Sequence, residues 1–192
     1  MAPVNRRALA QLALFAAFTI VALAAAASAA ADSHSTALER RVKAAFVFKF
    51  VGFVEWPPAA FEDAEEPLTF GVLGDDEFAS ELAAVIQGRR ALGRALRVRT
   101  VRPGDPLESL QVLYVARGDT ERLAQIARQL QREPLLIISD APDGLARGSV
   151  INFLLVDDRV RFEVALDAAE RAGLRLSSRL LSVAYRVRPA SP

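Results

Sequence analysis

Gln111-Val-Leu-Tyr-Val-Ala116 is the stretch that decides the fold, because it is a short and almost continuous apolar run. A run of this length is typical of a strand buried on both faces of a parallel sheet. Leu135-Leu-Ile-Ile-Ser-Asp140 repeats the pattern, and Leu123, Ile126 and Leu130 between them have helical spacing. The three segments together predict a parallel β-α-β unit.

Working outward, residues 67–72 and 96–101 predict two more strands with an amphipathic helix between them, and 149–156 and 159–166 predict a hairpin. A short helix ending at Gly173 and a last helix complete the chain. The predicted fold class is α/β: a layered mixed β-sheet flanked by helices, Rossmann-like, with a C-terminal β-hairpin and helix. Residues from 186 onward are predicted to be a tail.

Residues 1–31 are predicted to be a cleaved signal peptide. Arg6-Arg7 precedes a nearly continuous apolar run at 8–27, and Ala27-Ser28-Ala29 supplies the small residues of a cleavage site. The alternative is an uncleaved membrane anchor, since a span needs ~20 apolar residues. The Ala-rich composition and the small residues at its end favour cleavage, so residues 32–192 are predicted to form a single exported domain, located in the periplasm.

Composition excludes several functions. Lys+Arg number 24 and Asp+Glu 23, so no basic excess indicates a nucleic-acid partner. The chain has no Cys and one His, which excludes thiol nucleophiles and clusters of Cys or His ligands. No G-x-S-x-G motif is present. We therefore predict no catalytic residue, no metal and no cofactor, and a protein that is not an enzyme.

Two acidic motifs follow predicted strands. Gly71-x-x-Gly74-Asp75-Asp76 is interpreted as a tight turn with acidic helix capping, because it lacks the third glycine of a dinucleotide motif. Ser139-Asp140-x-x-Asp143 offers too few oxygens for a metal site and is interpreted as capping its own loop.

Residues 44–54 predict a helix that is apolar on nearly every side and that Trp56-Pro57-Pro58 ends. Such a helix is either central to the core or half docked on a second subunit, and the pattern leaves both open. On the second interpretation, Phe46, Phe50 and Phe53 are the candidate dimer interface.

The second strand of the predicted hairpin alternates apolar and charged residues, which gives it one buried and one charged face. Arginine side chains bind carboxylates in a fork geometry. The face is either merely solvated or binds a ligand or partner, and for the second case the candidate binding residues are Arg159, Arg161, Glu163, Arg171 and Arg175.

These segments also resemble the YfiR-like family of periplasmic regulatory proteins over about residues 37–187. The resemblance is carried by Lys43-Ala-Ala-Phe-Val-Phe-Lys-Phe-Val-Gly-Phe-Val-Glu-Trp-Pro57, Leu135-Leu-Ile-Ile-Ser-Asp140, Gly148-Ser-Val-Ile-Asn-Phe153, Val160-Arg-Phe-Glu163 and Ala172-Gly-Leu-Arg-Leu-Ser-Ser-Arg-Leu-Leu181. It implies a periplasmic α/β domain, often dimeric, that works by binding. The best-known member restrains an inner-membrane diguanylate cyclase until an outer-membrane lipoprotein sequesters it. That member uses disulfides, so its redox control does not transfer to a chain without Cys.

The resulting prediction is a non-enzymatic periplasmic regulator or adaptor. It would bind and repress the extracytoplasmic part of an inner-membrane signalling protein, a cyclase or sensor kinase, and so act on cyclic-di-GMP signalling as a homodimer, with an outer-membrane lipoprotein as a further partner. The alternative is a periplasmic small-molecule binding module whose ligand lies near Arg161, Glu163 and Arg175. An unrecognised enzyme is a third alternative.

Overall fold

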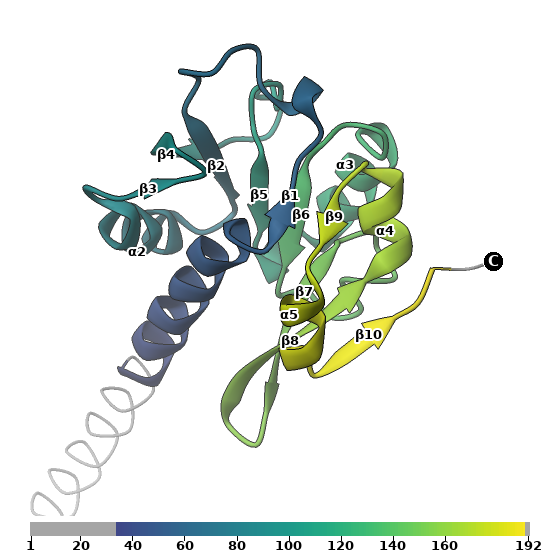
Figure 1. Cartoon of the computed structure of the whole chain (residues 1–192). Coiled ribbons are helices and arrows are strands. Elements are labelled where there is room, and N and C mark those ends of the chain that lie inside the picture. The colour runs from purple at the N-terminus through teal and green to yellow at the C-terminus, as the bar shows by residue number, and fades with distance from the viewer. Residues whose placement is uncertain (1–33, 191–192) are drawn as a thin grey trace, which may run out of the picture. The chain divides into compact units, whose positions relative to one another are not determined.

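The structure, a computed structural model, describes residues 34–190. Residue 40 begins the second of two compact units of the chain, and this unit contains both β-sheets (Figure 1). The first helix ends at residue 51. The elements that follow are β1 (Val54–Glu55), η1 (Pro58–Ala60), β2 (Leu68–Leu73), α2 (Asp76–Ile86), β3 (Arg90–Ala91), β4 (Arg94–Val101), β5 (Val112–Val115), η2 (Arg117–Asp119), α3 (Thr120–Gln129), β6 (Leu136–Ser139), β7 (Ile151–Val156), β8 (Arg159–Ala165), α4 (Leu166–Arg171), β9 (Arg175–Leu176), α5 (Ser178–Val183) and β10 (Arg186–Arg188).

The main sheet has eight strands in the order β10-β8-β7-β6-β5-β2-β4-β3. Strands β4, β2, β5, β6 and β7 are parallel to one another, whereas β3 pairs antiparallel with β4 and β8 pairs antiparallel with β7. Helix α2 connects β2 to β4, and α3 connects β5 to β6. This mixed sheet with helical crossovers confirms the predicted layered α/β fold and its hairpin.

Alternate side chains of the central strands enter two different cores. In β5, Val112 and Tyr114 join the larger core with helix 40–51, while Leu113 and Val115 join a smaller core under α3. Helix 40–51 and α3 therefore cover opposite faces of the sheet. A strand needs apolar residues on both sides in such a layer, which is why its sequence is a continuous apolar run.

The first helix ends three residues earlier than the sequence predicts. The amides of Gly52 and Phe53 bond the carbonyls of Lys49 and Phe50, three residues back, and so tighten the last turn. Val54–Glu55 then pairs antiparallel with β9 in a separate two-stranded sheet. The prediction was wrong because the partner of Val54 lies in a distant part of the chain.

The predicted tail is also wrong. Arg186–Arg188 forms β10, which pairs parallel with β8 at the edge of the sheet. The side chain of Arg188 donates to Asp167 on α4 at 3.1 Å, so a charge pair holds this short strand in place. By contrast, Gly173 has φ +66° and ends the α4 segment in the left-handed conformation, as predicted.

Candidate functional site

The β7–β8 hairpin extends beyond the strands on either side of it. Strands β7 and β8 are paired from Ile151↔Val164 to Val156↔Arg159, but β6 reaches only residues 151–152 and β10 only residues 163–165. Residues 153–162, which we call the arm, therefore have no strand neighbour on either outer edge among the residues that the structure describes. At the root of the arm the Phe162 carbonyl accepts from the Tyr185 amide at 2.8 Å, so the unpaired edges are those of residues 153–161. Figure 1 shows this hairpin projecting from the sheet.

Aromatic rings fix the root of the arm. Phe153 and Phe162, a register pair of the hairpin, are both buried. The Phe162 ring lies 4.9 Å from Phe50 and 5.8 Å from Phe46, centroid to centroid, and Phe153 lies 5.8 Å from Phe50. These four residues, called the aromatic cluster, join the arm to helix 40–51. The arm thus starts from a rigid base.

The turn at the tip has the geometry of a tight hairpin. Asp157 and Asp158 have φ of +48° and +56°, so both lie in the left-handed region. Two such residues in sequence make a type I′ turn, whose twist matches that of the flanking strands. Asp adopts this conformation more readily than most side chains. The arm is therefore a regular two-stranded ribbon up to its tip.

Two of the predicted binding residues lie together on the arm. Arg159 and Arg161 are exposed, and their side chains make no hydrogen bond or ion pair with any described residue. Leu155 on the other strand is 49% exposed, and Val160 is half-buried. Leu155 and Val160 are register partners, and they lie on the opposite face of the ribbon from Arg159 and Arg161. The tip therefore presents free guanidinium groups on one face and apolar surface on the other.

The structure places the other predicted binding residues elsewhere. The Glu163 side chain is only 14% exposed, 3.6 Å from Arg186 on β10, and accepts from Asn152 at 3.3 Å. Arg171 lies on α4 and pairs with Asp167, while Arg175 on β9 is 3.9 Å from Glu55. The alternating pattern of the sequence could not show that Glu163 differs in exposure from Arg159 and Arg161. The difference arises because β10 pairs with β8 beside Glu163 but not beside the two arginines.

The candidate dimer residues differ in exposure. Phe50 is 2% exposed within the single chain, so it belongs to the chain's own core. Phe46 and Phe53 are half-buried. A dimer interface on this helix stays a prediction, and Phe50 has almost no surface left to contribute to it.

A buried ion pair, which the sequence did not predict, lies at the carboxyl ends of the central strands. Lys43 on the first helix is 4% exposed, and its Nζ lies 2.6 Å from Asp140 Oδ2. The other carboxylate oxygen accepts from the Arg117 amide at 2.8 Å. Asp140 directly follows β6 and Arg117 follows β5. This pair, called the latch, therefore ties the helix to the sheet.

Tyr114 lies beside the latch. Its ring stacks on Phe78 at 4.0 Å between centroids. Burial, together with the charge of Asp140 and a hydrogen bond to it, raises the pKa of the Tyr114 phenol, which stays protonated. An ammonium, a backbone amide, a phenol and, at 3.5 Å, the Arg117 guanidinium thus surround one carboxylate. Because the Asp140 carboxylate is fully engaged by groups of the protein, its role is structural: it fixes the positions of Lys43, Tyr114 and the loop that begins at Arg117.

The first acidic motif acts as the sequence predicts, whereas Asp140 of the second does not cap its own loop and instead binds Lys43 and the Arg117 amide. Asp75 accepts from the Phe78 amide at 2.8 Å and so caps α2. Ser139 accepts from the Ala141 amide at 3.0 Å, and Asp140 holds the start of the neighbouring loop. The role of Lys43 was missed, and the signal available was a lysine among Ala and Phe residues on an apolar helix. Within residues 34–190, no three acidic or His residues are grouped as metal ligands would be.

Comparison with known protein families matches residues 40–185 to the model described as YfiR/HmsC-like. The matched segment includes the latch, the aromatic cluster and the arm. It begins at the first residue of the second compact unit and ends just before β10. In the part of the chain that the structure describes, no helix is long and apolar enough to span a bilayer.

Proposed function

Because the chain belongs to the YfiR/HmsC-like family of periplasmic regulators, which act with membrane signalling proteins, we propose that it binds and represses one such protein. The target is the extracytoplasmic part of an inner-membrane diguanylate cyclase or sensor kinase. The family is regulatory and non-catalytic, and in the proposal repression results from binding alone.

The observation that carries this proposal is the arm, with two unpaired edges and a fixed root. An unpaired strand edge offers backbone N–H and C=O groups to an added strand of a partner. Arg159 and Arg161 extend from the same segment and bind carboxylates in a fork geometry. An acidic, extended segment of the partner is therefore the best match to this surface.

The small-molecule alternative has weaker support at the predicted residues. Glu163 lines a shallow depression with Arg186 and Arg188, and neither Arg161 nor Arg175 is part of its lining. A ligand held jointly by Arg161, Glu163 and Arg175 would therefore need a different arrangement of these elements.

We expect Arg159→Glu combined with Arg161→Glu to abolish repression while leaving the fold intact. Neither side chain has a partner among the described residues, so each change should alter the free energy of unfolding by under ~0.5 kcal/mol. Reversing charges at the contact should weaken partner binding at least about tenfold. The measurement is cyclic-di-GMP, or the partner's output, in a deletion strain carrying each variant.

The matched control is Arg97→Glu with Arg179→Glu, which makes the same charge change at exposed positions on β4 and α5. It should repress like the wild type. A folded and exported arm variant that still represses fully would remove the arm from the interface. A deletion that leaves all signalling outputs unchanged would refute the regulator proposal itself. Glu163 is unsuitable for such a test because its side chain is largely buried against β10.

Export is part of the same proposal. Residues 1–31, the proposed signal peptide, lie outside the described residues, and 32–192 is the proposed mature domain. Mass spectrometry of a periplasmic extract should detect a chain that begins close to residue 32. Recovery of the intact chain from the inner membrane would instead favour the anchor. Two further partners remain proposals. A homodimer follows from the apolar first helix and from the family resemblance, and a sequestering outer-membrane lipoprotein follows from the resemblance alone.

A further inference from the structure

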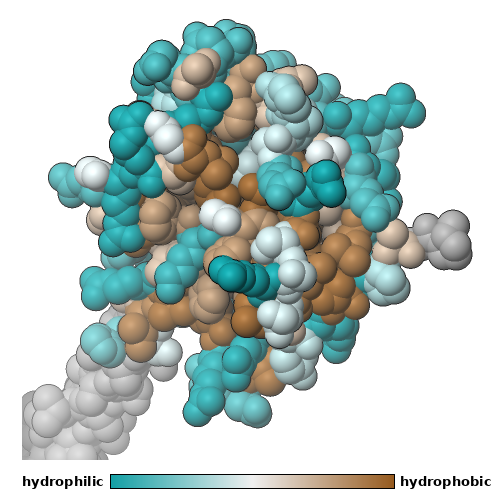
Figure 2. All heavy atoms as spheres, viewed as in Figure 1, coloured by the Kyte–Doolittle hydropathy of each residue, from teal (hydrophilic) through white to brown (hydrophobic). Residues whose placement is uncertain are grey.

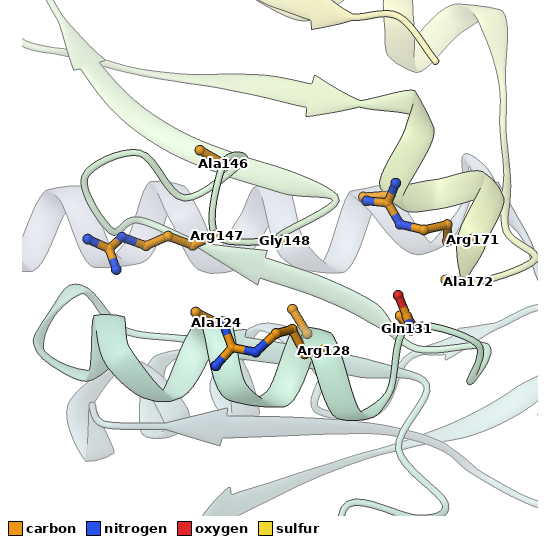
Figure 3. A pocket seen from close by; sticks show the side chains of 10 residues that line it. Ala124, Arg128, Gln131, Ala146, Arg147, Gly148, Arg171 and Ala172 are labelled. Atoms are coloured by element: carbon orange, nitrogen blue, oxygen red, sulfur yellow. The ribbon is translucent and has the colours of Figure 1, made fainter. Parts of the chain in front are cut away.

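A depression of about 360 Å³ lies between α3, the loop before β7, and the end of α4. Figure 3 shows its three arginines, one from each of these elements: Arg128 on α3, Arg147 on the loop and Arg171 on α4. Alanine side chains form much of the remaining lining, including Ala124 and Ala127. The depression thus has a cationic rim and a floor of methyl groups.

Two of these arginines have unused hydrogen-bonding capacity. Arg147 Nε is buried without a hydrogen-bond partner, and Nη1 of the same guanidinium lies 3.7 Å from the carboxylate of Glu121, which is 96% exposed. An ion pair to such an exposed group contributes little. Arg128 makes no hydrogen bond or ion pair with any residue from 34 to 190. A buried nitrogen without a partner is unfavourable. Because Nε itself is buried, a ligand in the depression reaches Arg147 through the terminal nitrogens of its side chain, which is 35% exposed.

Arg171 is held differently. Its guanidinium donates to Asp167 at 3.1 Å, and Arg188 donates to the same carboxylate. Burial alone would raise the pKa of Asp167, but the hydrogen bonds from Arg188 and Arg171 outweigh it and lower this pKa. Asp167 is therefore ionised at neutral pH and neutralises Arg171. The free positive charge of the depression belongs to Arg128 and Arg147.

The backbone next to Arg147 is built for close packing against α3. Gly148 has φ +102°, and a Cβ at this position would collide with the Cβ of Ala127. Only glycine both adopts this positive φ readily and lacks the Cβ that would collide. Its presence therefore allows Arg147 to lie beside α3, the helix that carries Arg128. The two guanidinium groups share one depression because of this contact.

We propose that this depression binds a small organic anion. A carboxylate or phosphate group is held by Arg128 and Arg147, both of which bind such oxyanions in a bidentate manner. A compact apolar body covers the methyl groups of Ala124 and Ala127. The volume lies within the range of small-molecule sites. This site is separate from the arm, so its occupancy can be tested without any signalling partner.

The test is isothermal titration calorimetry of the exported protein with four probes at constant ionic strength. Phenyl phosphate and benzoate combine a charge with an apolar body, inorganic phosphate has only the charge, and benzyl alcohol only the body. We expect one of the first two to bind at least tenfold tighter than either of the last two. Whichever of the two binds tighter identifies phosphate or carboxylate as the preferred group.

Two variants locate the binding. Arg128→Gln removes a guanidinium without an internal partner, so it should leave the melting temperature unchanged and weaken binding about ten- to a hundredfold. Ala124→Leu should weaken binding by filling the floor without any change in charge. Arg132→Gln, at an exposed neighbour outside the lining, is the control and should bind like the wild type. The proposal is wrong if no probe binds, if inorganic phosphate binds as tightly as the aromatic anions, or if both variants retain full affinity.

Discussion

Replacing Lys43 with Met should lower the free energy of unfolding by about 3–5 kcal/mol, the range seen when one partner of a buried ion pair is removed. The Asp140 side chain is 9% exposed and would stay buried without its ammonium partner, with only the exposed guanidinium of Arg117, 3.5 Å away, as a remaining cation. Met has an unbranched side chain of similar length to the aliphatic part of Lys. The loss of unfolding free energy therefore measures the removal of the charge and not the opening of a cavity. Urea denaturation followed by circular dichroism measures it.

The matched control on the same helix is Arg41→Met. Arg41 is 72% exposed and lies 3.7 Å from Glu81, so its removal should cost under ~1 kcal/mol. Combining Lys43→Met with Asp140→Asn removes both charges and keeps an acceptor for the Arg117 amide. The double variant should then be more stable than the sum of the two single losses predicts, by ~1 kcal/mol or more. If the two losses of unfolding free energy simply add, the interaction between Lys43 and Asp140 contributes nothing to stability.

The latch illustrates what a sequence pattern leaves out. Parallel strands were predictable at 111–116 and 135–140 because burial on both faces produces a continuous apolar run. The ion pair joins residues 43 and 140, and no local period relates them. For the same reason the pairing of β1 with β9 and of β10 with β8 was missed, since each depends on a partner distant in the chain.

The candidate binding residues were predictable only in part. Alternation along 159–164 assigned the correct face to Arg159 and Arg161, because that assignment depends on a single strand. Glu163 shares their face but not their exposure, since β10 lies beside it and not beside them. The arginines of the α3–α4 depression come from three separate segments. Only the fold brings Arg128 and Arg147 together.

The hydropathy of the surface does not by itself identify a binding site. Figure 2 shows hydrophilic side chains interspersed with apolar ones over the viewed face of the molecule. Exposed Leu155 on the arm is one of several large apolar residues at the surface. Single exposed apolar residues are ordinary, so the exposure of Leu155 alone does not indicate a binding surface. The unpaired edges of the arm do, because backbone groups without a strand partner are available to another chain.

The second large effect is expected at the root of the arm, where Phe162→Ala should lower the free energy of unfolding by about 3–5 kcal/mol. Phe162 is 3% exposed, and its ring contacts Phe46 and Phe50. Truncation opens a cavity between β8 and the first helix, and these rings are too large to close it without moving the backbone. Denaturant unfolding gives the size of the loss.

Leu155→Ala on the paired strand is the control, because that side chain is 49% exposed and its truncation should cost under ~1 kcal/mol. Phe162→Leu separates stability from function: it keeps most of the apolar volume, so the protein stays folded while the ring contacts are lost. If a fixed arm is needed for binding, this variant should repress less well than the wild type at equal periplasmic abundance. Equal losses of stability for Phe162→Ala and Leu155→Ala would contradict the expectation, because the arm would then owe its position to backbone pairing with β7 and not to the aromatic cluster.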